Sequence, residues 1–210
     1  MTSRKPIDDN TQPLQHPERL VIISGPSGAG KSTVVRKLLE SCPLEIELSV
    51  SATTRKPRSG ERDGIDYHFL THEAFQSRRA AGDFLECMEV FGRGDWYGTL
   101  NETVSTGLAA GKWVVLEIDV EGALSVIDRY PKTITIFIHC GSVDELERRL
   151  RNRGTETESA IARRLEVARR EMELASRYRY MVVNRDADEA AHEICGILST
   201  NGEDQTCMTN

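Results

Sequence analysis

The sequence predicts an α/β fold in which a parallel sheet is flanked by helices. Residues 20–24, 112–119 and 133–140 are aliphatic or β-branched runs of strand length, and each is followed by a helical segment. Strands that are apolar throughout are typical of sheets buried on both faces, and their alternation with helices is typical of parallel order. Residues 180–183 are expected to form one more strand, followed by a last helix over about 186–198.

Residues 46–99 interrupt this alternation. Turn dipeptides such as Asp63-Gly64 separate three expected strands, and only one short helix, at about 71–80, lies among them. The expected strands cover residues 46–52, 66–70 and 84–90. This pattern predicts a small lobe of mixed strands, at about 50–100, inserted into the core.

The rest of the chain consists of an Arg-rich segment and two ends. Residues 141–176 are expected to form a mobile helical lid, and the capping-box spacing from Ser142 to Glu145 predicts the start of a helix there. The globular domain is expected over 19–198, with a disordered leader at 1–18 and a disordered tail at 199–210.

The composition excludes several classes of protein. The 210 residues include 27 Lys and Arg against 33 Asp and Glu, and 39% are hydrophobic, so the chain is too apolar to be disordered. The net charge of −6 argues against general nucleic-acid binding, and no apolar run approaches the roughly 20 residues that span a bilayer. The five cysteines form no C-x-x-C pair, so we expect reduced thiols in a cytoplasmic protein.

Residues 25–32 carry a motif for binding phosphate. They read Gly-Pro-Ser-Gly-Ala-Gly-Lys-Ser, which matches G-x-x-x-x-G-K-[ST], and they lie between a predicted strand and a predicted helix. Backbone N–H groups of such a turn, with the helix N-terminus, form a concavity for the phosphates of a nucleoside triphosphate. The residues expected to contact these phosphates are Gly25, Ser27, Gly28, Ala29, Gly30, Lys31, Ser32 and Thr33.

The same motif predicts a magnesium site. The Ser32 hydroxyl is expected to hold Mg²⁺, and Asp119, at the carboxyl end of an aliphatic strand, is the expected carboxylate, partly acting through water. Glu117 and Glu121 are alternatives, because residues two apart on a strand share a face.

A second block of sequence is more specific than the phosphate-binding motif. Residues 49–69 read SVSATTRKPRSGERDGIDYHF, and residues 153–157 read Arg-Gly-Thr-Glu-Thr. With these blocks the chain resembles the guanylate kinase family over about residues 20–198. The resemblance implies a P-loop NTPase core with a lobe that binds a nucleoside monophosphate and a helical lid. It also implies reversible, ATP-dependent phosphorylation of GMP and dGMP, with Mg²⁺ as the cofactor.

Two arginines of the second block suit the phosphate of the acceptor nucleotide. Arg55 and Arg58 present forked guanidinium groups in a stiff turn, and the Tyr67 hydroxyl can donate a hydrogen bond to the same phosphate. Together with the resemblance, which assigns Ser51, Glu86 and Thr99 to a guanine pocket, these features give the set of residues expected to bind GMP: Ser51, Arg55, Arg58, Glu61, Tyr67, Glu86, Tyr97, Thr99 and Asp119.

Glu86 is expected to select the base. A two-residue period places it on one face with the apolar side chains of Phe84 and Met88. A carboxylate on an apolar face needs hydrogen-bond donors, and guanine supplies two, its N1–H and its 2-amino group. Adenine supplies neither, so a buried Glu86 would reject it. The alternative is that Glu86 pairs with a neighbouring arginine.

Phosphoryl transfer between two anions depends on positioning and on cations. Lys31 is expected to neutralise the donor side and Arg55 the acceptor side, and the resemblance assigns further lid and core arginines to the transferring group. The residues expected to be catalytic are Lys31, Arg55, Arg149, Arg153 and Arg164. Arg163 is an alternative to Arg164, and the resemblance places an adenine contact at Asn184.

The chain departs from the family pattern at residues 93–96, Arg-Gly-Asp-Trp, which make this loop longer than usual. Tyr97 and Thr99 are nevertheless expected to keep their register, since Tyr-Gly-Thr fits the pattern.

Two other functions were compatible with the fold. A related kinase with a different phosphorylated acceptor would lack Glu86 or Ser51, and a guanylate-kinase-like module that binds phosphopeptides would carry a degraded phosphate-binding motif; neither loss is seen. The expected partners are ATP with GMP or dGMP, with no nucleic acid and no membrane. The sequence leaves the oligomeric state open.

Overall fold

Five parallel strands form the centre of the computed structural model, which describes residues 14–89, 94–152 and 157–207, the last five without side chains. The strands follow the order β2–β7–β1–β8–β9, and every neighbouring pair is parallel. Their bounds are β1 Leu20–Ser24, β2 Ile46–Leu48, β7 Trp113–Glu117, β8 Ile134–His139 and β9 Tyr180–Val183. The predicted α/β fold with a parallel sheet is confirmed.

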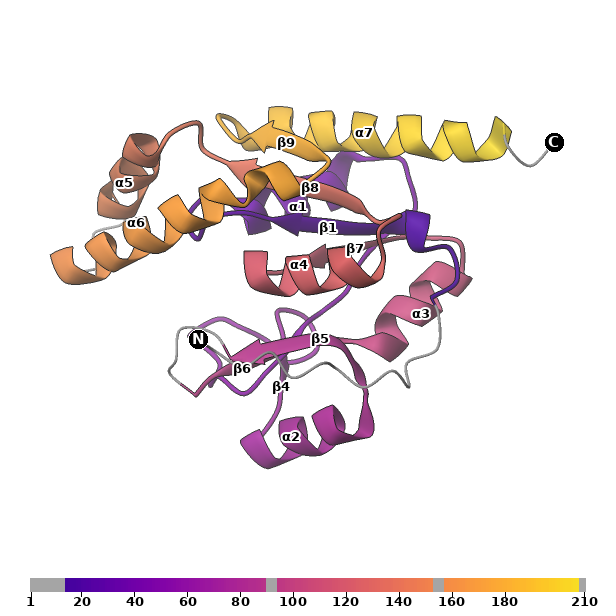
Figure 1. Cartoon of the computed structure of the whole chain (residues 1–210), viewed down its shortest axis with the longest axis horizontal. Helices are drawn as coiled ribbons and strands as arrows, with labels where there is room; N and C mark the ends of the chain where they lie inside the picture. The colour runs from indigo at the N-terminus through magenta and orange to yellow at the C-terminus, as the bar shows by residue number, and fades with distance from the viewer. Residues whose placement is uncertain (1–13, 90–93, 153–156, 208–210) are drawn as a thin grey trace.

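Helices cover both faces of this sheet because its strands are apolar on both faces. In β1, Val21 and Ile23 pack against α1 (Lys31–Ser41) and α7 (Ala187–Cys207). Leu20 and Ile22 pack on the opposite side against α3 (Asn101–Ala109) and α4 (Val120–Arg129). Figure 1 shows α7 along one side of the sheet and α4 along the other.

A second sheet of mixed strands forms a lobe, drawn at the bottom of Figure 1. Its order is β4–β3–β6–β5, with β3 parallel to β4 and antiparallel to β6. The bounds are β3 Ala52–Thr53, β4 His68–Phe69, α2 His72–Ala81, β5 Phe84–Glu89 and β6 Trp96–Leu100. The stacked rings of Phe75 and Phe84, 4.4 Å apart, form its small core.

The prediction of one strand over residues 46–52 is wrong. β2 belongs to the central sheet, where the Ser49 backbone N–H still donates to the Val115 carbonyl. The Ser51 carbonyl already accepts from His68 of the lobe. The chain therefore changes sheets at residues 49–51, and a continuous run of strand-forming residues hides this change.

Two helices, α5 (Val143–Asn152) and α6 (Glu158–Glu173), occupy the segment expected to be a lid. The predicted helix start is confirmed, because the Ser142 hydroxyl accepts a hydrogen bond from the Glu145 N–H at 3.1 Å. Figure 1 shows both helices projecting beyond one end of the central sheet. Arg153 lies outside the described residues.

The described structure continues beyond both ends of the expected globular part, 19–198. Leu14 packs against the core, and residues 17–19 form a short 3-10 helix, η1. Helix α7 continues to Cys207, and the Asn201 amide donates to the Tyr180 hydroxyl at 3.0 Å. The helical pattern of apolar residues ends at Leu198, which is buried, but the helix itself continues beyond it. In the described part of the chain, no helix has the length and apolar character needed to cross a membrane.

The expectation that all cysteines are reduced is also wrong in this structure. Cys42, at the end of α1, forms a disulfide with Cys195 of α7, and their Cα atoms are 5.7 Å apart. The two helices pack against each other, which brings the cysteines close together. A Cα separation of this size is usual for a disulfide. The residues are 153 positions apart in sequence, so their spacing gave no indication of the bond.

Candidate active site

The phosphate-binding motif forms the turn between β1 and α1. At Gly25, with φ of 138°, a Cβ atom would lie 2.0 Å from the Ile138 carbonyl oxygen of β8, so only glycine fits. Gly30 has a left-handed conformation and begins α1 as its N-cap. The Lys31 ammonium folds over the turn and donates to the carbonyls of Gly25 (2.7 Å) and Pro26 (3.2 Å). The expected residues thus lie together on one turn between β1 and α1.

Carboxylates surround Lys31. Burial lowers the pKa of Lys31, while the negative charges of Glu117, Glu171 and Asp119 raise it. The Ser32 hydroxyl donates to Glu117 at 2.5 Å. Asp119 caps α4 by accepting from the Gly122 N–H at 2.7 Å, and burial raises the pKa of its carboxyl group. In this structure Glu117, the alternative to Asp119, is the carboxylate in contact with Ser32.

In the lobe, Arg55 is held in place by its neighbours. Its guanidinium donates to both oxygens of Glu61 (2.9 and 3.0 Å) and to the Tyr97 hydroxyl (3.0 Å). It also lies 5.3 Å from the centre of the Tyr67 ring. Hydrogen bonds from Arg55 hold the pKa of Glu61 below its usual value. Arg58 is exposed, and its backbone N–H donates to Glu61 at 2.7 Å, so the carboxylate fixes the whole turn.

Glu86 is buried, with 4% of its surface exposed, but for a different reason from the one predicted. A register shift between Phe84 and Glu86 interrupts the alternation of β5. Phe84 therefore packs into the lobe with Cys87, and Glu86 lines a cavity with Met88. The prediction that Phe84 shares the face of Glu86 is wrong.

Thr99 lies opposite Glu86 on β6, as its expected register requires. Its hydroxyl donates to the Glu86 carboxylate at 2.7 Å. Burial raises the pKa of Glu86 to about 7, and the hydrogen bond from Thr99 only partly opposes this shift. Met88 pairs with Tyr97 in the same register. The longer loop therefore does not shift Tyr97 or Thr99 out of the register expected for them.

One cavity of about 230 Å³ joins the phosphate-binding turn to the lobe. It contains predicted residues of the donor and acceptor sites, but none of the described arginines lines its wall. The lining residues are Gly25, Ser27, Lys31, Ser51, Tyr67, Glu86, Met88, Tyr97, Gly98, Glu117, Ile118, Asp119 and Glu171.

Sequence reasoning missed Glu171. This residue of α6 lines the cavity, and one of its carboxylate oxygens is buried without a hydrogen-bond partner among the described residues. Burial raises the pKa of Glu171 to about 7. Glu171 follows the buried residues Ile161, Leu165 and Ala168 at helical spacing, so a carboxylate at the end of an apolar stripe was the available indication.

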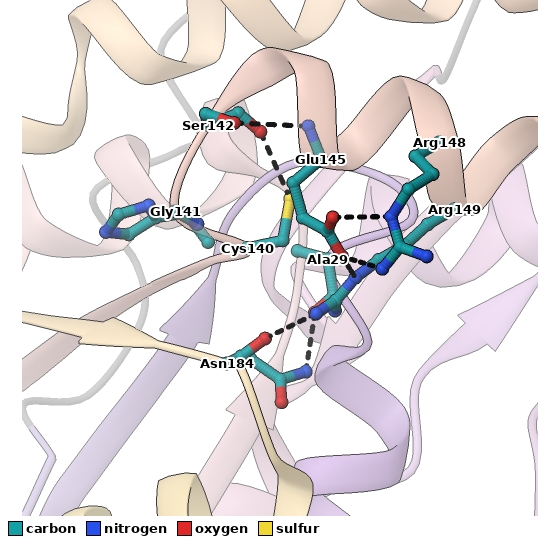
Figure 2. Close-up of polar contacts among 9 residues, drawn as sticks. Ala29, Cys140, Gly141, Ser142, Glu145, Arg148, Arg149 and Asn184 are labelled. Carbon is teal, nitrogen blue, oxygen red and sulfur yellow. Dashed lines mark hydrogen bonds and ion pairs between the residues drawn. The ribbon is translucent and has the colours of Figure 1, made fainter.

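Asn184 and Arg149 lie behind the phosphate-binding turn. The buried Asn184 side chain donates to the Ala29 carbonyl at 2.7 Å, and the Arg149 guanidinium donates to the Asn184 backbone carbonyl at 2.8 Å. Figure 2 shows these contacts together with Glu145, which binds Arg149. Arg164 lies elsewhere, on α6. The structure thus brings Arg149 to the donor-side turn but not to the wall of the cavity.

Comparison with known proteins identifies the family of this chain. The model of the guanylate kinase family matches residues 17–201. The chain belongs to the guanylate kinase family. It is 58% identical over 196 residues to a guanylate kinase of Rhodopirellula baltica, covering 93% of this chain and 94% of that one. A guanylate kinase of Clostridium perfringens is 47% identical over 179 residues, covering 85% and 82%.

A solved structure of the family has the same fold. The crystal structure of guanylate kinase from Anaplasma phagocytophilum is 34% identical, with a TM-score of 0.69, and covers 86% of this chain and 84% of that one. The central sheet and the mixed-strand lobe described above are therefore features of a guanylate kinase fold.

Proposed function

We infer that this protein is an enzyme that transfers the terminal phosphoryl group of ATP to GMP or dGMP. The observation that carries this inference is one cavity with an intact phosphate-binding turn on one side and the buried carboxylate of Glu86 on the other. The turn suits a triphosphate, and the carboxylate suits the two N–H donors of guanine. Relatives over nearly the whole chain carry the name guanylate kinase.

On the donor side, we propose Mg²⁺ as the cofactor. Mg²⁺ prefers oxygen ligands and is usually held by one or two carboxylates together with substrate phosphates. The contact of the Ser32 hydroxyl with Glu117, and the position of Asp119 on the same cavity, fit this requirement. When bound, Mg²⁺ would neutralise negative charge on the donor phosphates. Lys31, now bonded to two carbonyls, would reach the terminal phosphates.

On the acceptor side, Arg55 supplies a fixed positive charge for the GMP phosphate. Its bidentate contact with Glu61 orients it before substrate arrives, so little ordering is needed on binding. The exposed Arg58 and the hydroxyl groups of Tyr67 and Tyr97 complete the phosphate site. Ser51 on the cavity wall is placed to serve the guanine O6, while Glu86 accepts from the other edge.

The arginines outside the cavity have different roles in this proposal. Arg149 serves the donor nucleotide, because it is bonded to Asn184 beside the phosphate-binding turn. Arg153 and Arg164 serve the transferring phosphoryl group, as the family resemblance implies. Closure of the lid would bring such cations in and exclude water from the reaction. We also propose that the enzyme works in the cytoplasm, where ATP and GMP are available.

A panel of acceptor nucleotides tests this function. In a coupled assay with ATP and Mg²⁺, GMP and dGMP are expected to turn over at roughly 1–100 per second, with AMP, CMP and UMP as poor acceptors. Lys31→Ala is expected to abolish turnover while the protein stays folded. Turnover of AMP at the rate of GMP would contradict the role of Glu86. Tight GMP binding without any turnover would instead indicate a binding module.

A further inference from the structure

Helix α5 is docked on the phosphate-binding turn through apolar contacts. Leu146 and Leu150 are almost fully buried, and a Cβ atom on Gly28 would lie 3.0 Å from one and 3.1 Å from the other. The absence of a side chain at Gly28 therefore lets α5 approach the backbone of the turn. This part of the lid segment therefore packs directly against the phosphate-binding turn.

A chain of polar contacts, drawn in Figure 2, also joins α5 to the turn. The Glu145 carboxylate accepts from Nε of Arg149 at 2.8 Å. Nη2 of Arg149 donates to the Asn184 carbonyl at 2.8 Å, and the Asn184 side chain donates to the Ala29 carbonyl at 2.7 Å. The same amide nitrogen is 2.5 Å from where a Cβ of Gly30 would lie. The contacts thus connect α5, through the end of β9, to the turn that receives phosphate.

Glu145 fixes the direction of Arg149. The Ser142 cap holds the Glu145 backbone, and the guanidinium groups of Arg148 and Arg149 hold the pKa of its carboxyl near 2, so it is ionised. Both Glu145 and Arg149 have 26% of their side chains exposed, whereas the Arg148 side chain is 64% exposed. Arg148 therefore shares the carboxylate without taking part in the path to the turn.

We propose that Glu145 is a positioning residue for the phosphoryl donor, holding Arg149 against Asn184 and thereby the backbone of the phosphate-binding turn at Ala29. The proposal rests on the proposed function and deepens it. A turn that must present several N–H groups to phosphate gains affinity when its shape is fixed beforehand. Without Glu145, Arg149 is free to turn toward solvent, and the Asn184 carbonyl loses its charged donor.

The test compares Glu145→Ala and Glu145→Gln with the wild type. Calorimetric titration with ATP and Mg²⁺, and steady-state kinetics with each substrate varied, are measured for each protein. Glu145→Ala is expected to weaken ATP binding roughly tenfold, the effect of losing one charge-assisted hydrogen bond. The KM for ATP is expected to rise by a similar factor. KM for GMP is expected to stay unchanged. Glu145→Gln, which keeps an acceptor oxygen, is expected to show a smaller effect in the same direction. Both variants keep the Ser142 cap, because its donor is the backbone N–H of residue 145.

Arg148→Gln is the matched control, because it removes the exposed partner of the same carboxylate. It is expected to bind ATP as the wild type does. Unchanged ATP binding in folded Glu145→Ala overturns the proposal, as does an equal loss in Arg148→Gln or an equal rise of KM for GMP. If the wild type binds ATP but does not phosphorylate GMP, the proposed function fails, and the binding titrations still decide the role of Glu145.

Discussion

Glu86 is buried, and the Thr99 hydroxyl on the neighbouring strand donates to its carboxylate. A carboxylate in such a place is costly to ionise, which is why its pKa lies near 7 rather than near 4.5. The two N–H groups of guanine would stabilise the ionised form at the moment of binding. Base recognition and protonation of Glu86 are therefore coupled.

This coupling predicts a pH dependence of GMP binding. Below pH 7 the protonated Glu86 no longer accepts two hydrogen bonds, so GMP affinity is expected to fall as pH decreases through about 7, approaching tenfold per unit. Above that pH the carboxylate is ionised and the affinity levels off. Titration calorimetry between pH 5.5 and 8.5, in roughly half-unit steps, measures the effect.

Glu86→Gln is the control for this measurement. It is expected to bind GMP weakly at every pH, and to keep only the pH dependence that arises from the GMP phosphate and from other groups, such as Glu171. Identical pH profiles for the wild type and Glu86→Gln would contradict the assignment.

At the residue scale, residue type and spacing were enough to propose the phosphate-binding residues, Arg55 and Glu86. In the structure Lys31 and Glu86 line one cavity, whereas Arg55 lies in the lobe against Glu61, outside the cavity wall. Glu171 was missed because it reaches the cavity from a helix far along the chain. Sequence reasoning left open which carboxylate contacts Ser32, because the strand pattern does not distinguish Glu117 from Asp119. In the structure the contact is made by Glu117.

At the scale of elements, the strands and helices of the central sheet were predictable because each is apolar in a regular pattern. The errors lie where a hydrogen-bond pattern changes inside a continuous run. Residues 46–52 pass from one sheet to the other, and the bulge in β5 turns Glu86 away from Phe84. Neither the change of sheet nor the bulge alters the kinds of residue in its segment, so the sequence pattern does not predict either of them.

The disulfide between α1 and α7 predicts a dependence of stability on redox state. In the chain-entropy model, a bond that closes a loop of this length, 153 positions, contributes up to about 5 kcal/mol. Reduction with dithiothreitol is expected to lower the melting temperature by about 10 °C, as followed by circular dichroism. A smaller shift would indicate residual structure in the reduced, unfolded chain.

The cysteines supply matched controls for this experiment. The double variant Cys42→Ser with Cys195→Ser is expected to melt at the lower temperature with or without reductant. Cys87→Ser removes a free cysteine of the lobe and is expected to keep the response of the wild type. If the melting temperature of the wild type does not change with reductant, and mass spectrometry of the untreated, intact protein finds free thiols, the bond does not form in solution.

At the scale of the whole molecule, the cavity of the candidate active site lies at the junction of two sheets. Leu85 of β5 packs into the core under the central sheet, next to Glu86. At Gly122 of α4, a Cβ atom would lie 2.9 Å from a Glu86 oxygen, so the Glu86 carboxylate lies directly against the first turn of α4. Lys31, at the start of α1, belongs to the core, whereas Arg55, in the turn after β3, belongs to the lobe.

This arrangement predicts that the molecule contracts when both substrate sites are filled. Anionic ligands shared by cations of the core, the lobe and the lid favour a closed form that excludes water. Small-angle scattering is expected to give a smaller radius of gyration with a bisubstrate ligand, adenosine and guanosine joined through a phosphate chain, than with ATP or GMP alone. Lys31→Ala is expected to show a weaker response. An unchanged radius at saturating ligand would exclude a closure of this size.

The bond between Cys42 and Cys195 also gives the chain an unusual topology. It makes a covalent ring that contains the whole lobe, helices α5 and α6, and every strand of the central sheet except β1. Backbone scission at any one point of that ring would leave both pieces tethered. The GMP lobe would then remain at high local concentration beside the ATP site, even in a nicked molecule.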